Sequence, residues 1–151
     1  MLRQAFTDRL KDAMKARNVR TVSTVRLILA ALKERDVAAR GEGNTAGLPD
    51  PDIARMLQGM IKQRRESIVL FEQGNRPDLA QQENEEIAII ESFLPRQMTD
   101  EEITAAAQSV IAGTGASGIR DMGKVMAELR QRHAGSMDFS RAGVIVRQLL
   151  G

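Results

Sequence analysis

The chain has 151 residues, of which 42% are hydrophobic and 28% are charged, and it contains no cysteine, tryptophan or tyrosine. This composition is typical of a folded globular protein, and the missing cysteines exclude disulfides, thiolate chemistry and cysteine-based zinc sites. No stretch approaches the roughly 18 apolar residues of a membrane span, so we expect no membrane partner and a cytoplasmic protein. The net charge is +2, but the charges are unevenly distributed along the chain. Residues 1–40 carry ten basic and four acidic side chains, whereas residues 41–95 carry five basic and ten acidic ones. A polyanionic partner would therefore meet the ends of the chain, and the acidic segment is either a partner surface or a solvated one.

The first 95 residues are predicted to form four helices. Apolar residues recur at three- and four-residue spacing over residues 2–14, 22–32, 53–71 and 79–94, which indicates one apolar face on each helix. A loop rich in glycine is expected at 41–49, and glycine, asparagine and proline residues separate the other helices.

The remaining residues are predicted to form a smaller bundle of three helices. Thr99 opens a capping-box pattern at the start of the first, the second covers roughly residues 118–133, and Asp138 is the expected N-cap of the third. We therefore predict an all-α protein with a four-helix N-terminal domain, residues 1–95, and a three-helix C-terminal domain, residues 96–151.

No pattern of residues indicates catalysis. The single histidine, His133, lies near the predicted end of a helix, where a positive charge is favoured, and we do not expect it to act as a base or a metal ligand. The acidic run Glu83, Glu85 and Glu86 is interpreted as a solvated helix face. The sequence contains no glycine-rich phosphate-binding loop. We expect no catalytic residue, no metal site and no cofactor.

A buried ion pair is expected in the N-terminal domain. Projection at 100° per residue places Arg64 in the apolar stripe of the third helix and Glu83 in that of the fourth. Because a tight turn makes these helices antiparallel neighbours, we predict an Arg64–Glu83 ion pair, whose breakage typically costs about 3–5 kcal/mol. The alternative is that Arg64, with Lys62 and Arg65, receives an anion.

Four segments of the chain resemble the GatB/YqeY family, in particular its YqeY-like branch. They read KQRRES at 62–67, FEQGNRPDLAQQENEEIAII at 71–90, FLPRQMTDEE at 93–102 and DMGKVM at 121–126. The resemblance covers essentially the whole chain and implies an all-helical fold in two parts. The C-terminal part is similar to the tail domain of the B subunit of the tRNA-dependent amidotransferase, which implies tRNA binding or assistance to amide transfer with glutamine as the amide donor. The catalytic domain of that subunit has no counterpart in these segments.

Gly123 and the basic residues around it are the candidate binding site. Gly123 and Gly143 flank two apolar stripes, so their missing side chains either let helices cross closely or, at Gly123, expose backbone to a phosphate beside Lys124. The expected tRNA-binding patch consists of Arg120, Gly123, Lys124, Arg130, Arg132, Arg141 and Arg147. The alternative is that these arginines only keep the surface soluble. Without exposed aromatic residues, we expect contacts to phosphates rather than to bases.

Three functional hypotheses remain open. The first is a tRNA-binding accessory protein without an active site of its own. The second is a protein-interaction module that docks on an enzyme, such as an amidotransferase or an aminoacyl-tRNA-related enzyme. The third is a non-autonomous component of glutamine-dependent amide transfer, a carbon–nitrogen ligase only by family association.

Overall fold

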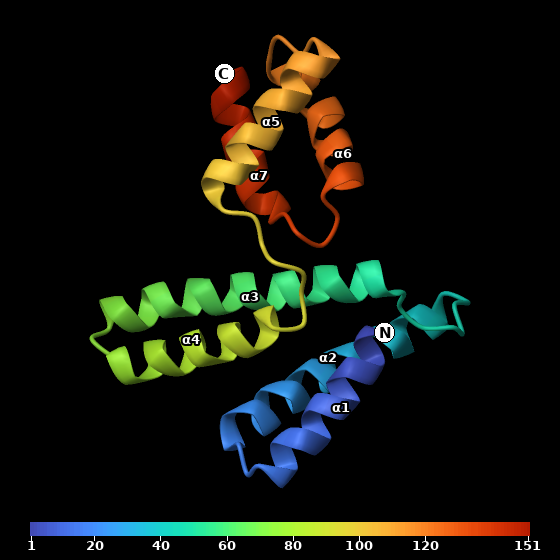
Figure 1. The fold of residues 1–151 in the computed structure, drawn as a ribbon, viewed down its shortest axis with the longest axis vertical. Helices are drawn as coiled ribbons and strands as arrows, with labels where there is room; N and C mark the ends of the chain where they lie inside the picture. The colour runs from blue at the N-terminus through green and yellow to red at the C-terminus, as the bar shows by residue number, and fades with distance from the viewer. The chain divides into compact units, whose positions relative to one another are not determined.

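The computed structural model describes residues 1–151 and divides them into two compact units, residues 1–94 and 95–151 (Figure 1). Every regular element is helical, so the predicted all-α class is confirmed. Each unit has its own apolar core. None of the helices is both long enough and apolar enough to cross a lipid bilayer.

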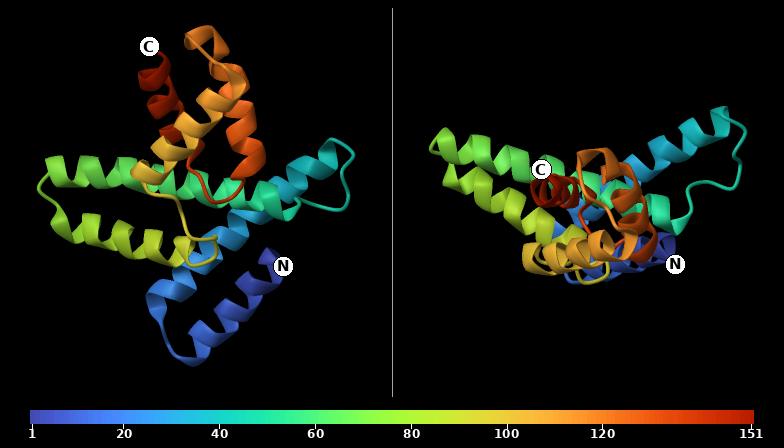
Figure 2. Two further views of the ribbon diagram at one scale, coloured as in Figure 1. Left: turned by 45° about the horizontal axis from the view of Figure 1, so that its top comes forward. Right: turned by 90° about the horizontal axis from the view of Figure 1, so that it is seen from above.

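The N-terminal unit consists of two helical hairpins (Figures 1 and 2). The first pairs α1 (Leu2–Lys15) with α2 (Val19–Gly41), and the second pairs α3 (Asp50–Gln73) with α4 (Pro77–Glu91). Asn18 caps α2 by accepting a hydrogen bond from the Thr21 amide at 3.2 Å.

The core of this unit draws on all four helices. Phe6, Ile28, Ile53, Leu57 and Ile90 are fully buried, so each amphipathic stripe places its side chains in one shared cluster. Burying a side chain of this size stabilises the fold by roughly 1.5–3 kcal/mol.

The N-terminus and the segment before α3 are held together by a second, polar set of contacts. The guanidinium of Arg3 donates two hydrogen bonds to the Asp36 carboxylate, at 2.7 and 2.8 Å, and a third to the Leu48 carbonyl at 3.0 Å. The Leu48 amide donates to the same carboxylate at 3.0 Å. These contacts hold the pKa of Asp36 at about 2, mainly through the hydrogen bonds from Arg3. Gly47 adjoins them with a φ of +85°, and a Cβ there would lie 2.7 Å from the Arg3 guanidinium, so another residue would strain the backbone and displace Arg3.

The C-terminal unit packs α5 (Asp100–Thr114), α6 (Met122–Arg132) and α7 (Phe139–Leu150) around one core, with a 3-10 turn at Ile119–Asp121. The core includes the buried side chains of Ile103, Ala107, Val110, Val125, Met126, Leu129, Met137, Ala142 and Val146.

The ends of these helices follow local capping chemistry. The capping box of Thr99 and Glu102 is present, and Asp138 accepts hydrogen bonds from the amides of Ser140 and Arg141, as the sequence predicts. The helix predicted over 118–133 is shorter than expected, because the 3-10 turn precedes α6.

Candidate functional site

A groove between α6 and α7 is the main surface feature among the predicted binding residues. Its volume is about 400 Å³, and its lining combines thioether, aromatic and aliphatic side chains with two arginines. The lining residues are Met122, Met126, Arg130, Phe139, Ser140, Gly143, Val144 and Arg147. The groove therefore offers an apolar surface next to positive charge.

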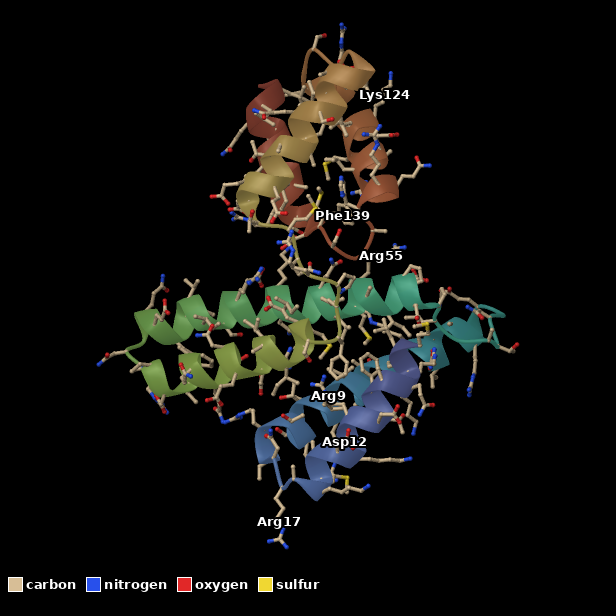
Figure 3. The ribbon with its side chains drawn as sticks, viewed as in Figure 1. Arg9, Asp12, Arg17, Arg55, Lys124 and Phe139 are labelled. Atoms are coloured by element: carbon tan, nitrogen blue, oxygen red, sulfur yellow. The ribbon has the colours of Figure 1, made fainter.

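Phe139 and Arg130 contact each other within this groove. The guanidinium carbon of Arg130 lies 5.8 Å from the centroid of the Phe139 ring, within the range of a cation–π interaction. Phe139 is the first residue of α7, next to the N-cap, and is only partly buried (Figure 3). Its place in a surface site could not be read from the sequence, because Phe139 stands three and seven residues before Ala142 and Val146 and so shares their apolar stripe.

Ion pairing separates the predicted cations into two groups. The Arg132 side chain lies 2.8 Å from the Glu128 carboxylate, and Arg141 forms an ion pair with Asp100, with its Nε donating at 3.2 Å. The other four form no ion pair, and these are Arg120, Lys124, Arg130 and Arg147. Charge that is already neutralised by a carboxylate contributes little to an external phosphate, so the second group is the better candidate for anion binding.

The seven predicted residues do not form one continuous patch. Arg130 and Arg147 line the same groove, whereas Lys124 lies about 120° from Arg130 around α6 and points away from the bundle (Figure 3). Arg120 and Lys124 are instead close to Asp121 at the start of α6. The pKa of Asp121 is lowered, mainly by the hydrogen bond from the Ser117 amide at 3.0 Å and also by those two cations.

Gly123 has a different structural setting from the one expected. It is the second residue of α6 and is exposed, so the penalty for a glycine inside a helix does not apply in full. A Cβ at Gly123 would meet nothing within 4 Å, and the interpretation that this glycine lets helices cross closely is therefore wrong. At Gly143 a Cβ would meet the Met122 methyl at 3.7 Å, which is ordinary contact.

Arg64 lies between α3 and α4, where two carboxylates face it. Its Nε lies 3.0 Å from the Glu86 carboxylate and 4.0 Å from that of Glu83, so Glu86 is the closer partner. The Arg64 side chain is only 11% exposed, and it also donates to the Met60 carbonyl at 3.2 Å. Arg64 is therefore neutralised within the fold and is not open to an external anion.

The acidic run on α4 was interpreted as a solvated face, and this is wrong for two of its three members. Glu83 and Glu86 point toward Arg64, with side chains 22% and 15% exposed, and only Glu85 is more exposed, in an ion pair with Arg20 at 3.2 Å. The pKa of Glu83 is raised, first by burial and then by the negative charge of Glu86.

Comparison with known proteins places this fold in a family. The family model described as Yqey-like protein matches residues 3–150. The chain belongs to the YqeY-like family.

Proteins similar to this chain occur in fungi. An uncharacterized protein of Schizosaccharomyces pombe is 27% identical over 99 residues, which are 66% of this chain and 76% of that protein. A protein of Lachancea thermotolerans named "Altered inheritance of mitochondria protein 41, mitochondrial" is 33% identical, over 56% of this chain and 43% of that protein. The protein of the same name in Clavispora lusitaniae is 32% identical, over 62% of this chain and 53% of that protein. The chain thus spans about half the length of these two relatives.

Proposed function

We propose that the protein is an RNA-binding accessory factor, with tRNA as the expected class of RNA, and that its C-terminal unit makes the contact. The observation that carries the proposal is the set of four unpaired cations in this unit, Arg120, Lys124, Arg130 and Arg147. The resemblance of this unit to the amidotransferase tail domain supports RNA as the polyanion. A cytoplasmic setting belongs to the same proposal.

Phosphate contacts are the chemistry that these side chains supply. An arginine offers a planar fork of donors that matches two phosphate oxygens, and Lys124 adds a point charge. Arg132 and Arg141 are excluded from the count because carboxylates neutralise them. Four contacts would give a log–log dependence of affinity on salt with a slope of roughly −3 to −4.

The proposed role is binding without an active site of its own. Any glutamine-dependent amide transfer, the reaction of a carbon–nitrogen ligase, would then take place on a partner enzyme that holds the same tRNA. In this arrangement the protein would contribute RNA affinity and orientation, and the partner would supply the reacting groups.

The groove favours a second candidate function, a protein-interaction module. Met122, Met126, Phe139 and Val144 present an apolar surface beside Arg130 and Arg147, which suits an amphipathic helix with acidic flanks. The partner would be an enzyme such as an amidotransferase or an aminoacyl-tRNA-related enzyme. Such binding would persist at salt concentrations that remove RNA, because apolar contacts are not screened.

A titration of labelled bulk tRNA at two salt concentrations tests the first function. Arg130→Gln and Lys124→Gln should each weaken binding and reduce the magnitude of the salt slope by about 1. Arg132→Gln is the matched control, since it removes the same charge from the same helix at an ion-paired position. Equal losses in all three variants, or a slope near zero, would refute the proposed phosphate contacts. Binding that needs a second protein and survives high salt would favour the interaction module.

A further inference from the structure

The turn that joins α1 to α2 carries apolar side chains that the core does not use. Val19 is 78% exposed and Met14 is 52% exposed. Together with Val22, Ser23, Arg17 and Arg26 they line a pocket of about 320 Å³ at the end of this hairpin. Exposed aliphatic residues are common one at a time, but a cluster at a hairpin end, bordered by charge, is typical of a binding surface.

The charge around this cluster is mainly positive, and the exposed Asp12 is the nearest carboxylate along the chain. No acidic residue occurs between Asp12 and Glu34, and Lys15, Arg17 and Arg26 form no ion pair. Arg20, by contrast, is held by Glu85 of α4. We call Met14, Lys15, Arg17, Val19 and Arg26 the basic tip.

Arg17 shows how the turn presents this charge. Its backbone has a φ of +55°, a conformation that is common for glycine, less so for asparagine, and rare for most other residues. The side chain projects from the turn, away from both helices of the hairpin (Figure 3). A flat, negatively charged surface could therefore meet Arg17 and the neighbouring cations together.

The combination of aliphatic side chains and cations identifies the chemistry of the partner. A nucleic acid would engage the cations through its phosphates, but it would leave the exposed side chains of Met14 and Val19 without an apolar partner. An anionic lipid bilayer satisfies both parts of the tip, since phosphate head groups meet the cations and the acyl boundary takes the aliphatic side chains. The long stems of lysine and arginine allow both contacts at once.

We propose that the basic tip binds the surface of membranes that contain anionic phospholipid. The expectation of no membrane partner rested on the missing spanning segment, which excludes insertion across a bilayer and not attachment to its surface. The proposal is independent of RNA binding by the C-terminal unit, because the two surfaces share no residue.

Sedimentation with vesicles tests the proposal on the full chain. We expect salt-sensitive binding to phosphatidylcholine vesicles that contain about 30% phosphatidylglycerol and little binding to pure phosphatidylcholine. Replacing the three cations together, as Lys15→Gln, Arg17→Asn and Arg26→Gln, should lower the partition coefficient about 100-fold, from roughly fivefold per cation. Asparagine at position 17 tolerates the positive φ, so this variant should keep the turn.

A second pair of variants separates apolar contact from charge. Val19→Glu should reduce binding at least about tenfold while keeping the fold, because an acidic residue in the first turn of α2 is favourable. Val37→Glu is the matched control, since Val37 is 57% exposed on the same helix, and it should change binding less than about twofold. Far-UV circular dichroism checks that both variants stay helical.

Three results would overturn the proposal. The first is equal binding to neutral and anionic vesicles, or no binding to either. The second is an equal loss of vesicle binding in Val19→Glu and Val37→Glu, which would show that only the net charge matters. The third is a tip variant that no longer binds tRNA but still binds vesicles, which would make the basic tip part of a nucleic-acid-binding surface. Loss of tRNA binding through Lys124→Gln with vesicle binding intact would leave the membrane proposal standing.

Discussion

Replacing Asp36 by asparagine should destabilise the N-terminal unit through one defined set of contacts. The carboxylate accepts two hydrogen bonds from Arg3, at 2.7 and 2.8 Å, and one from the Leu48 amide at 3.0 Å. An asparagine amide has nearly the same shape, but its NH₂ group would face a guanidinium donor in place of an acceptor. The change therefore removes charge and one acceptor without opening a cavity.

The pKa of Asp36 sets the size of the effect. A fall from the ordinary value of 3.8 to about 2 corresponds to roughly 2.4 kcal/mol of stabilisation of the charged form. Because the Arg3 side chain is 42% exposed, solvent screening lowers this figure, and we expect a loss of about 1–2 kcal/mol at pH 7.

The same pKa predicts how the effect depends on pH. A carboxyl group whose pKa is lowered by folding stabilises the protein fully above the pKa of the unfolded chain, and this contribution is lost as the pH falls through the lower, folded value. The difference between wild type and Asp36→Asn should therefore be constant from neutral pH to about pH 5 and fall to roughly half near pH 3.

Urea unfolding followed by circular dichroism measures this difference across the pH range. Asp12→Asn is the control, because Asp12 is exposed on α1 of the same unit and forms no ion pair (Figure 3). This account of the contacts would be refuted if Asp36→Asn lowered the free energy of unfolding no more than Asp12→Asn does. It would also be refuted if the effect of Asp36→Asn stayed unchanged down to pH 3.

The remaining predictions concern the two other sites described above. Arg64→Ala should lower the free energy of unfolding by about 2–4 kcal/mol in a urea titration, since it removes the cation that Glu83 and Glu86 share. An unchanged midpoint would show that these ion pairs do not stabilise the fold. Glu83→Gln should raise stability at pH 7, because the raised pKa of Glu83 marks a destabilised charge, and this gain should shrink as the pH falls through that pKa and wild-type Glu83 takes up its proton. Gly123→Ala should raise the free energy of unfolding by about 0.4–1 kcal/mol, because a Cβ there meets nothing. If the same variant weakens tRNA binding while Gly59→Ala, another open glycine in a helix, does not, a ligand approaches the backbone at Gly123.

Local patterns in the sequence were sufficient for the helices and their caps. An apolar stripe specifies both the helix and its buried face, and residues such as Thr99 and Asp138 bond to amides only two or three positions away. Such contacts involve neighbours in the chain, so their geometry is set before the helices pack. The 3-10 turn before Met122 was missed because Ile119, three residues before Met122, continues the apolar period of the helix that follows.

Only the tertiary structure decided which charges are neutralised by contacts between helices. Glu83 and Glu86 lie three residues apart on one helical face, so projection identifies an acidic partner for Arg64 but not which of the two comes within 3 Å. Likewise, only the packing of α7 on α5 pairs Arg141 with Asp100, which lies 41 residues earlier in the chain. The Glu128–Arg132 pair, by contrast, has the i,i+4 spacing within one helix that the sequence itself shows. The physical reason is that an ion pair depends on a separation of a few ångströms between side chains, which helix rotation and packing set and which apolar periodicity alone does not fix.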